Sequence, residues 1–70
     1  MMKQPLKSKL IDGVSYDEES HRLLLFMVNG HRREYVDVPL YVYTDLLATK
    51  SPGTYYTRLI KPKFAAAHSG

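Results

Sequence analysis

The sequence predicts one α+β domain, in which a three-stranded antiparallel β-meander is followed by two short α-helices packed on one face. Three observations favour this fold. Two strand-like segments flank Asn29-Gly30, a dipeptide that is typical of hairpin turns. After Pro39 the apolar residues change from a strand-like to a helical spacing. The pair Ser51-Pro52 then marks the start of a second helix.

Two strands are expected before the hairpin turn. Residues 10–17 alternate weakly between apolar and polar side chains, and Gly13 in this segment indicates a bulge. The apolar positions of the segment are Leu10, Val14 and Tyr16. Residues 23–28 are apolar on both alternating faces, which favours a central strand that is buried on both sides.

The register of the hairpin decides which side chains of the third strand face the core. A two-residue Asn-Gly turn would place Leu25 opposite Glu34. A three-residue loop, with its glycine in the left-handed conformation, instead places Leu23 opposite Tyr35. A shift by one residue moves every side chain to the other face. We favour the three-residue loop, because it joins the tyrosine to an apolar set.

Two helices are expected in the second half of the chain. Pro39 can open the first helix, because the first turn needs no backbone donor at that position. Its apolar residues at helical spacing are Val42, Tyr43, Leu46 and Leu47. In the second helix, Ser51 is expected at the N-cap and Pro52 at the first helical position, with Pro62 ending the helix. The apolar stripe of this helix is Tyr55, Tyr56, Leu59 and Ile60.

These elements predict the core and the limits of the domain. The residues expected in the core are Leu23, Leu25, Val42, Leu46, Tyr56 and Ile60. Residues 9–64 are expected to form the single domain, with Phe64 folding back as a last core contact. Residues 1–8 are expected to be a flexible basic arm and residues 65–70 a disordered tail.

Composition argues against several classes of protein. The chain has no cysteine and only three scattered histidines, so neither a disulfide nor a structural metal site is indicated. No apolar run approaches the roughly 18 residues that span a bilayer. The basic N-terminal segment lacks the apolar stretch of a signal peptide. We therefore expect a cytoplasmic protein that does not cross a membrane.

No motif indicates catalysis. A nucleophile needs a base that is itself oriented, and the sequence has neither a Gly-x-Ser-x-Gly elbow nor a Ser-His-Asp order. The segment SPGT lacks the remainder of a phosphate-binding loop. If His21 lies opposite Asp37 across the strands, a polar cross-strand pair is the commoner interpretation. We expect no enzyme activity, no cofactor and no small-molecule substrate.

The charge distribution favours RNA as a partner. The net charge is +3 and the pI about 9.3, and cations alternate with tyrosines in the last third of the chain. Cations attract phosphates by counterion release, and exposed aromatic rings stack on bases. The residues expected to bind nucleic acid are Arg33, Tyr35, Lys50, Tyr55, Arg58, Lys61 and Lys63. Two alternatives that involve no nucleic acid stay open. The charges can form a solvated surface of mixed sign, and most tyrosines can lie in the core, with Tyr43 and Tyr56 expected inside.

A protein-interaction adaptor or a small homodimer is the alternative function. Two short helices can cover one sheet face only, whereas residues 23–28 are apolar on both. Leu24, Phe26 and Val28 would then form a second apolar face, which a partner or a second copy would bury. The edge strand over residues 10–17 offers another surface for pairing.

Several of these residues occur together in a known order. They are Asn29-Gly30, Tyr35, Val38-Pro39, Val42-Tyr43, Leu46-Leu47, Ser51-Pro52-Gly53, Tyr55-Tyr56, Ile60-Lys61 and Phe64. Over about residues 9–64 the sequence resembles the KTSC domain, a small module found at the C-terminus of some lysyl-tRNA synthetases and as a stand-alone protein. The resemblance implies the α+β fold, and no enzyme activity, metal or cofactor. RNA binding has been suggested for the family from its synthetase context.

The sequence departs from the family pattern in the middle of the chain. The family tends to show Tyr-x-Tyr where this sequence has Arg33-Glu34-Tyr35. If that aromatic pair is a stacking platform, an arginine replaces half of it here, although a guanidinium group also stacks on a base. Thr49 is a second departure, at a position where a small apolar residue is usual.

Overall fold

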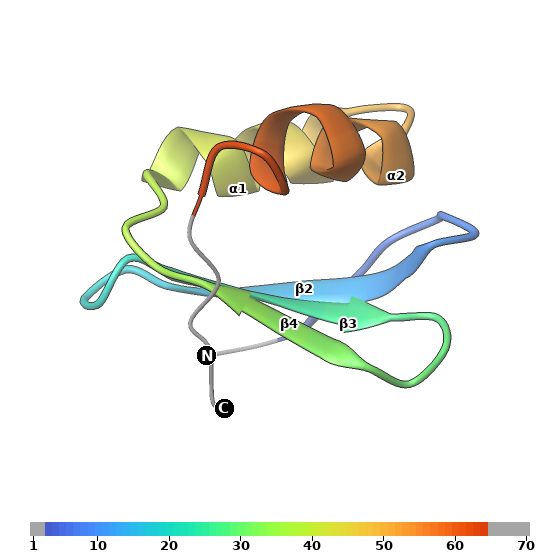
Figure 1. The fold of residues 1–70 in the computed structure, drawn as a ribbon, viewed down its shortest axis with the longest axis horizontal. Coiled ribbons are helices and arrows are strands. Elements are labelled where there is room, and N and C mark those ends of the chain that lie inside the picture. The colour runs from blue at the N-terminus through green and yellow to red at the C-terminus, as the bar shows by residue number, and fades with distance from the viewer. Residues whose placement is uncertain (1–2, 65–70) are drawn as a thin grey trace.

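The computed structural model describes residues 3–64 and shows an antiparallel sheet covered on one face by helices (Figure 1). The four strands, in sheet order β1-β2-β3-β4, are Gln4–Pro5, Ile11–Asp17, Arg22–Met27 and Arg32–Tyr35. The helices are α1 (Leu40–Ala48) and α2 (Pro52–Tyr55), and α2 continues directly into a π-helical turn, η1 (Tyr56–Ile60). The predicted α+β fold with an antiparallel sheet is confirmed, but the sheet has four strands rather than three.

The additional strand lies in the segment that was expected to be a flexible arm, so this prediction was wrong for β1. Gln4 pairs with Val14 and Pro5 with Gly13. Side chains anchor the same segment, because Lys3 Nζ lies 2.9 Å from Asp12 Oδ2. A two-residue strand that contains a proline is too short to show an alternation of apolar and polar residues in the sequence. It is recognised only from its pairing with β2.

The bulge predicted at Gly13 is present and changes which face of β2 is buried. The register shifts between the pairs Ile11–Met27 and Gly13–Phe26. One extra residue inverts the alternation on its N-terminal side. Ile11 is therefore fully buried, whereas Leu10, which was expected on the apolar face, is 40% exposed.

The hairpin has the register that the sequence favoured. Leu23 pairs with Tyr35 and Leu25 with Arg33. Gly30 has a φ of 91°, a conformation that costs little only in glycine. The loop closes by a hydrogen bond from the Gly30 N–H to the Met27 carbonyl at 3.0 Å.

Both helices begin where prolines place them. Pro39 is the N-cap of α1 and remains extended, so this helix begins at Leu40, one residue later than expected. Pro52 takes the first position of α2. Ser51 occupies the N-cap of α2, but its side chain makes no capping hydrogen bond. The π-helical turn is marked by the bond from the Lys61 N–H to the Tyr56 carbonyl.

The core lies between the sheet and the helices. All six residues that were predicted in the core are buried. The other buried apolar residues are Ile11, Val14, Tyr16, Met27, Tyr35 and Val38. Tyr43 and Phe64 are half-buried against this core, and the Tyr43 ring stacks on Tyr16 with centroids 5.3 Å apart. The tail predicted for residues 65–70 lies outside the described residues.

Candidate nucleic-acid interface

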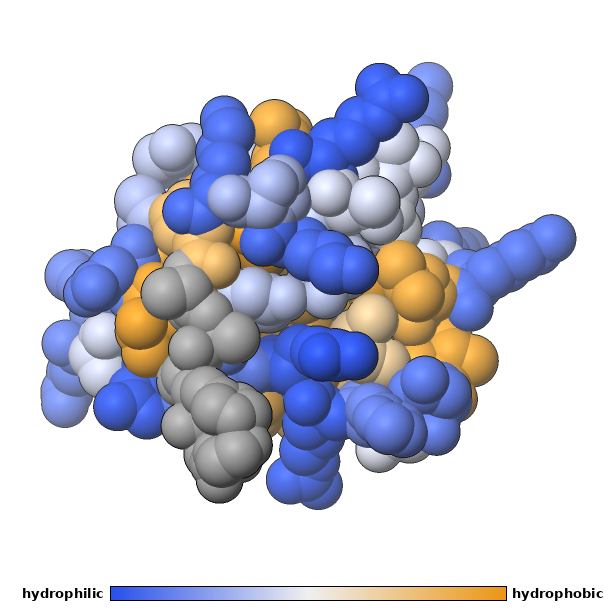
Figure 2. Space-filling model, viewed as in Figure 1, coloured by the Kyte–Doolittle hydropathy of each residue, from blue (hydrophilic) through white to orange (hydrophobic). Residues whose placement is uncertain are grey.

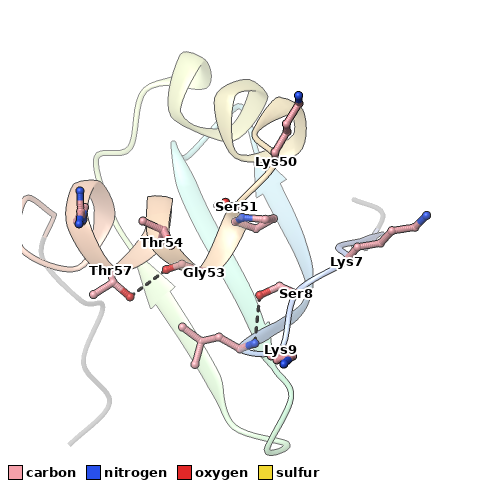
Figure 3. Close-up of a pocket in the computed structure, with 11 residues that line it drawn as sticks. Lys7, Ser8, Lys9, Lys50, Ser51, Gly53, Thr54 and Thr57 are labelled. Carbon is pink, nitrogen blue, oxygen red and sulfur yellow. Dashed lines mark hydrogen bonds between the residues drawn. The ribbon is translucent and has the colours of Figure 1, made fainter.

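A groove of about 620 Å³ separates the β1–β2 loop from the start of α2 (Figure 3). Its cationic residues are Lys7, Lys9, Lys50 and Arg58. Its hydroxyl-bearing residues are Ser8, Ser51, Thr54 and Thr57. None of the described residues that line it is acidic. Two segments far apart in the sequence thus combine their positive charges on one concave surface.

A tight turn presents the two lysines of the β1–β2 loop. The Ser8 hydroxyl accepts hydrogen bonds from the N–H groups of Leu10, at 3.1 Å, and Ile11, at 3.3 Å. Lys7 and Lys9 flank this serine. Gly53 lies against the turn from the helix side, because a Cβ at this position would be 3.2 Å from Ser8 Oγ. The floor of the groove is therefore a close contact between loop and helix.

The groove cations are available to a ligand. All four residues are exposed. Within residues 3–64 the ion pairs are Lys3–Asp12 and Arg22–Glu34, and neither involves the groove. Lys7 and Lys50 extend outward from the rim (Figure 3). Long, exposed cations around an open groove suit a polyanion that lies along it better than one enclosed anion.

The groove continues along the helical segment. A hollow of about 370 Å³ shares Ser51, Thr54 and Arg58 with it and adds Tyr55 and Leu59. A third hollow, of about 160 Å³, shares the last two residues. Its other lining residues include Tyr41, Asp45, Lys63 and Phe64. The groove and the two hollows thus adjoin through shared lining residues, and together they are called the track.

The structure brings together only part of the predicted RNA-binding set. Lys50 and Arg58 line the groove, while Tyr55 and Lys63 line the track beyond it. Arg33 and Lys61 are exposed but line neither the groove nor the two hollows that continue it.

Tyr35 does not belong to an RNA-binding surface, and its prediction was wrong. Its side chain is buried, and its hydroxyl lies 2.9 Å from the hydroxyl of Tyr56. The two rings meet edge to face with centroids 6.1 Å apart. Burial raises the pKa of Tyr35 well above its ordinary value, and the hydrogen bond to Tyr56 raises it further. A ring held in this way cannot stack on a base.

Sequence reasoning missed the contribution of the N-terminal segment to the groove. Lys7 and Ser8 were assigned to a flexible arm, and Lys9, at the start of the predicted domain, was not among the residues expected to bind. The Lys-Ser-Lys spacing immediately before a strand is the one local signal, since alternate lysines there can flank a turn. Their position beside Lys50 depends on long-range packing, which the sequence does not display.

The outer face of the sheet is partly covered by its own cations. Lys3 Nζ lies 4.8 Å from the centroid of the Phe26 ring, and the Arg32 guanidinium carbon lies 5.4 Å from it. Leu24 is half-buried, whereas Val28 is 55% exposed. Figure 2, which views the molecule from the side with the helices above the sheet, shows a mostly hydrophilic surface with hydrophobic residues in separate groups.

The described residues also include features that bear on metals, catalysis and membranes. Within residues 3–64, no three histidine or acidic side chains cluster as a metal site would require. His21 and Asp37 line one shallow hollow, and both have positive φ. None of the helices in the described part of the chain is long and apolar enough to span a membrane.

Comparison with known proteins gives a consistent result. The model of the KTSC domain family matches residues 7–64. A protein from Tsukamurella paurometabola is 36% identical over 63 residues, which cover 90% of this chain and 94% of that protein. The crystal structure of a KTSC domain protein from Yersinia pestis superposes with a TM-score of 0.89 at 25% identity. That similarity covers 99% of this chain and 97% of the other.

Proposed function

The chain belongs to the KTSC domain family, and from this premise we propose that it is a small, non-catalytic, cytoplasmic module that binds RNA through its basic groove. The observation that supports the proposal is the convergence of Lys7, Lys9, Lys50 and Arg58 on one groove without a lining carboxylate. The chain has seven acidic residues and a net charge of only +3, so a groove lined by cations and by no carboxylate supports binding of a polyanion.

The chemistry of the groove matches a sugar–phosphate backbone. Cations that neutralise phosphates release condensed counterions, and this release supplies most of the affinity of non-specific nucleic-acid binding. Hydroxyl groups add hydrogen bonds to phosphate and ribose oxygens. The Ser51 hydroxyl makes no capping hydrogen bond in α2. The ligand we propose is tRNA or a single-stranded RNA.

The direct test is fluorescence anisotropy with tRNA and with labelled single-stranded oligonucleotides, at low and high salt. We expect Lys50→Gln combined with Arg58→Gln to weaken binding by about tenfold at low salt, because two phosphate contacts are lost. The matched control is Arg33→Gln combined with Lys61→Gln, which removes the same charge outside the groove. Equal weakening by both pairs would reject the groove. Binding weaker than about 100 μM at low salt for every RNA would reject the function.

A protein-interaction adaptor or homodimer is the second candidate. Its support is the exposed pair Leu10 and Val28, which adjoin because the Val28 N–H donates to the Leu10 carbonyl at 2.9 Å. Specific interfaces bury about 800 Å² on each partner, far more than two side chains provide. Sedimentation velocity over a range of concentrations tests the homodimer, and a strict monomer would count against it.

A further inference from the structure

The third hollow of the track differs chemically from the basic groove. It lies between α1 and residues 55–64, and its volume is about 160 Å³. Pockets for drug-sized ligands usually measure about 300–1,000 Å³, so this hollow suits a single small planar group. Three aromatic side chains line it, namely Tyr41, Tyr55 and Phe64. Tyr41 is 62% exposed, so its ring is open to a stacking partner.

A single carboxylate lies among these aromatic rings. Asp45 is exposed and accepts one hydrogen bond, from the Tyr55 hydroxyl to Oδ2 at 3.3 Å. Neither ion pair within residues 3–64 involves this carboxylate. An ionised carboxylate has about four acceptor positions, so it retains capacity for donors of a ligand. It repels a phosphate, and the ligand group that suits this hollow therefore carries N–H donors on a flat ring.

One cation lines the hollow and another lines its neighbour. Lys63 lines the hollow itself. Through Tyr55 and Leu59 this hollow adjoins the one that Arg58 lines, which in turn shares residues with the basic groove. A nucleotide with its base beside Asp45 would therefore have a cation near each neighbouring phosphate. This alternation of cation, aromatic hollow and cation matches the repeat of a single strand, in which bases are not paired.

We propose that the hollow lined by Tyr41, Asp45, Tyr55 and Phe64 binds one unpaired base of the RNA, and that it selects guanine. This inference rests on the proposed function and specifies its ligand. Guanine presents two adjacent donors, N1–H and N2–H, and a carboxylate can accept both at once. Uracil presents one donor between two carbonyl oxygens, which would face the negative charge. Adenine and cytosine offer one amino group each and rank between the two.

The test uses the unmodified protein and three short oligouridylates. They carry guanosine, inosine or the original uridine at one central position. Inosine keeps N1–H but lacks the 2-amino group. We expect the guanosine oligomer to bind about five- to tenfold more tightly than the uridine oligomer, with inosine between them. Equal affinity for all three oligomers would overturn the base site while leaving the basic groove in place. Failure of every oligomer to bind would overturn both.

Asp45→Asn separates base recognition from general electrostatics. Removing a negative charge strengthens binding of any RNA if the carboxylate only repels phosphates. If the carboxylate accepts guanine, the substitution instead removes the preference for guanosine while uridine binding stays equal or improves. Asp45 is exposed, so the variant is expected to fold. An unchanged guanosine preference in Asp45→Asn would contradict the proposal. An unchanged affinity for the guanosine oligomer in Tyr41→Ala would contradict it too, because the exposed ring is expected to stack on the base.

Discussion

The hydroxyl groups of Tyr35 and Tyr56 form a polar pair inside an apolar core, 2.9 Å apart. Removing one hydroxyl leaves the other buried without its partner, which costs about 1–3 kcal/mol, whereas removing both leaves no unpaired group. We expect Tyr35→Phe and Tyr56→Phe each to lower the free energy of unfolding by about that amount. The double variant should cost less than the sum of the two.

Urea denaturation of the two single variants and the double variant measures this coupling. The control is Tyr41→Phe, because Tyr41 is exposed and its loss of a hydroxyl should change stability by less than about 0.5 kcal/mol. Strictly additive losses in the double variant would show that the two hydroxyls do not stabilise each other.

The same pair makes stability depend on alkaline pH. Burial, followed by the hydrogen bond to Tyr56, raises the pKa of Tyr35 above its ordinary value of 10.0. The unfolded chain therefore loses this proton at a lower pH than the folded chain. The contribution to stability is complete below pH 10.0 and is lost as the pH rises through the folded pKa. Burial also raises the pKa of Tyr16 and Tyr55, which act in the same direction.

Thermal or urea unfolding between neutral pH and pH 11 tests this dependence, with pH 11 chosen as about one unit above the ordinary tyrosine pKa. We expect stability to fall above pH 10.0, and to fall less steeply in Tyr35→Phe, which has one fewer shifted group. An equally steep fall in the variant would assign the alkaline sensitivity to other tyrosines.

At the scale of elements, Gly13 allows β1 to join the sheet. A Cβ at this position would lie 3.0 Å from the backbone oxygen of Gln4 and 2.5 Å from Lys3 Cε. The lysine end can move, but the backbone of the paired strand cannot move without separating from β2. We expect Gly13→Ala to detach β1, and to speed hydrogen exchange of the Leu6 N–H by about tenfold. That N–H donates to the Asp12 carbonyl at 3.0 Å.

Gly30→Ala is the matched control for this effect. No atom lies within 4 Å of a Cβ at Gly30, so its cost is one of backbone conformation, about 1–2 kcal/mol. Gly30→Ala should loosen the β3–β4 hairpin. It should change hydrogen exchange of the Leu6 N–H only as far as it lowers the stability of the whole domain. Equal acceleration of Leu6 exchange in both variants would show that Gly13 acts through global stability alone.

The elements that the sequence predicts correctly are those with local chemical causes. Pro52 acts on its own neighbours, so the start of the second helix follows from it. The Asn29-Gly30 turn predicts the hairpin, and the apolar partners that Tyr35 requires decide its register. The π-helical turn at Tyr56–Ile60 has no such local mark. The predicted apolar stripe included Leu59 beside Ile60, but Leu59 is 40% exposed. This exposure is what allows Leu59 to line the track.

The candidate site was less predictable than the fold, because its parts come from separated segments. Lys50 and Arg58 could be predicted from a basic helix with tyrosines. Lys7 and Lys9 could not, since a turn held by Ser8 and a strand as short as β1 place them. Tyr35 was misplaced because an aromatic residue that alternates with cations looks the same in an exposed strand and in a buried one.

At the scale of the whole molecule, the groove makes a quantitative prediction about salt. Each phosphate neutralised on a single strand contributes about −0.7 to the slope of log Kobs against log salt concentration. Lys7, Lys9, Lys50 and Arg58 together therefore predict a slope of about −3 for single-stranded RNA. Cations spread over a mixed surface would contact fewer phosphates at once, and would give a smaller slope.

Anisotropy titrations at several salt concentrations measure this slope. Lys50→Gln combined with Arg58→Gln should reduce it to about −1.5, because two of the four contacts are lost. Lys61→Gln combined with Arg33→Gln should leave it unchanged, although the net charge falls by the same amount. The slope thus depends on the number of phosphates contacted, whereas the affinity at one salt concentration also depends on the net charge of the protein. A slope near −1 in the unmodified protein would show that the four cations do not act on one strand together.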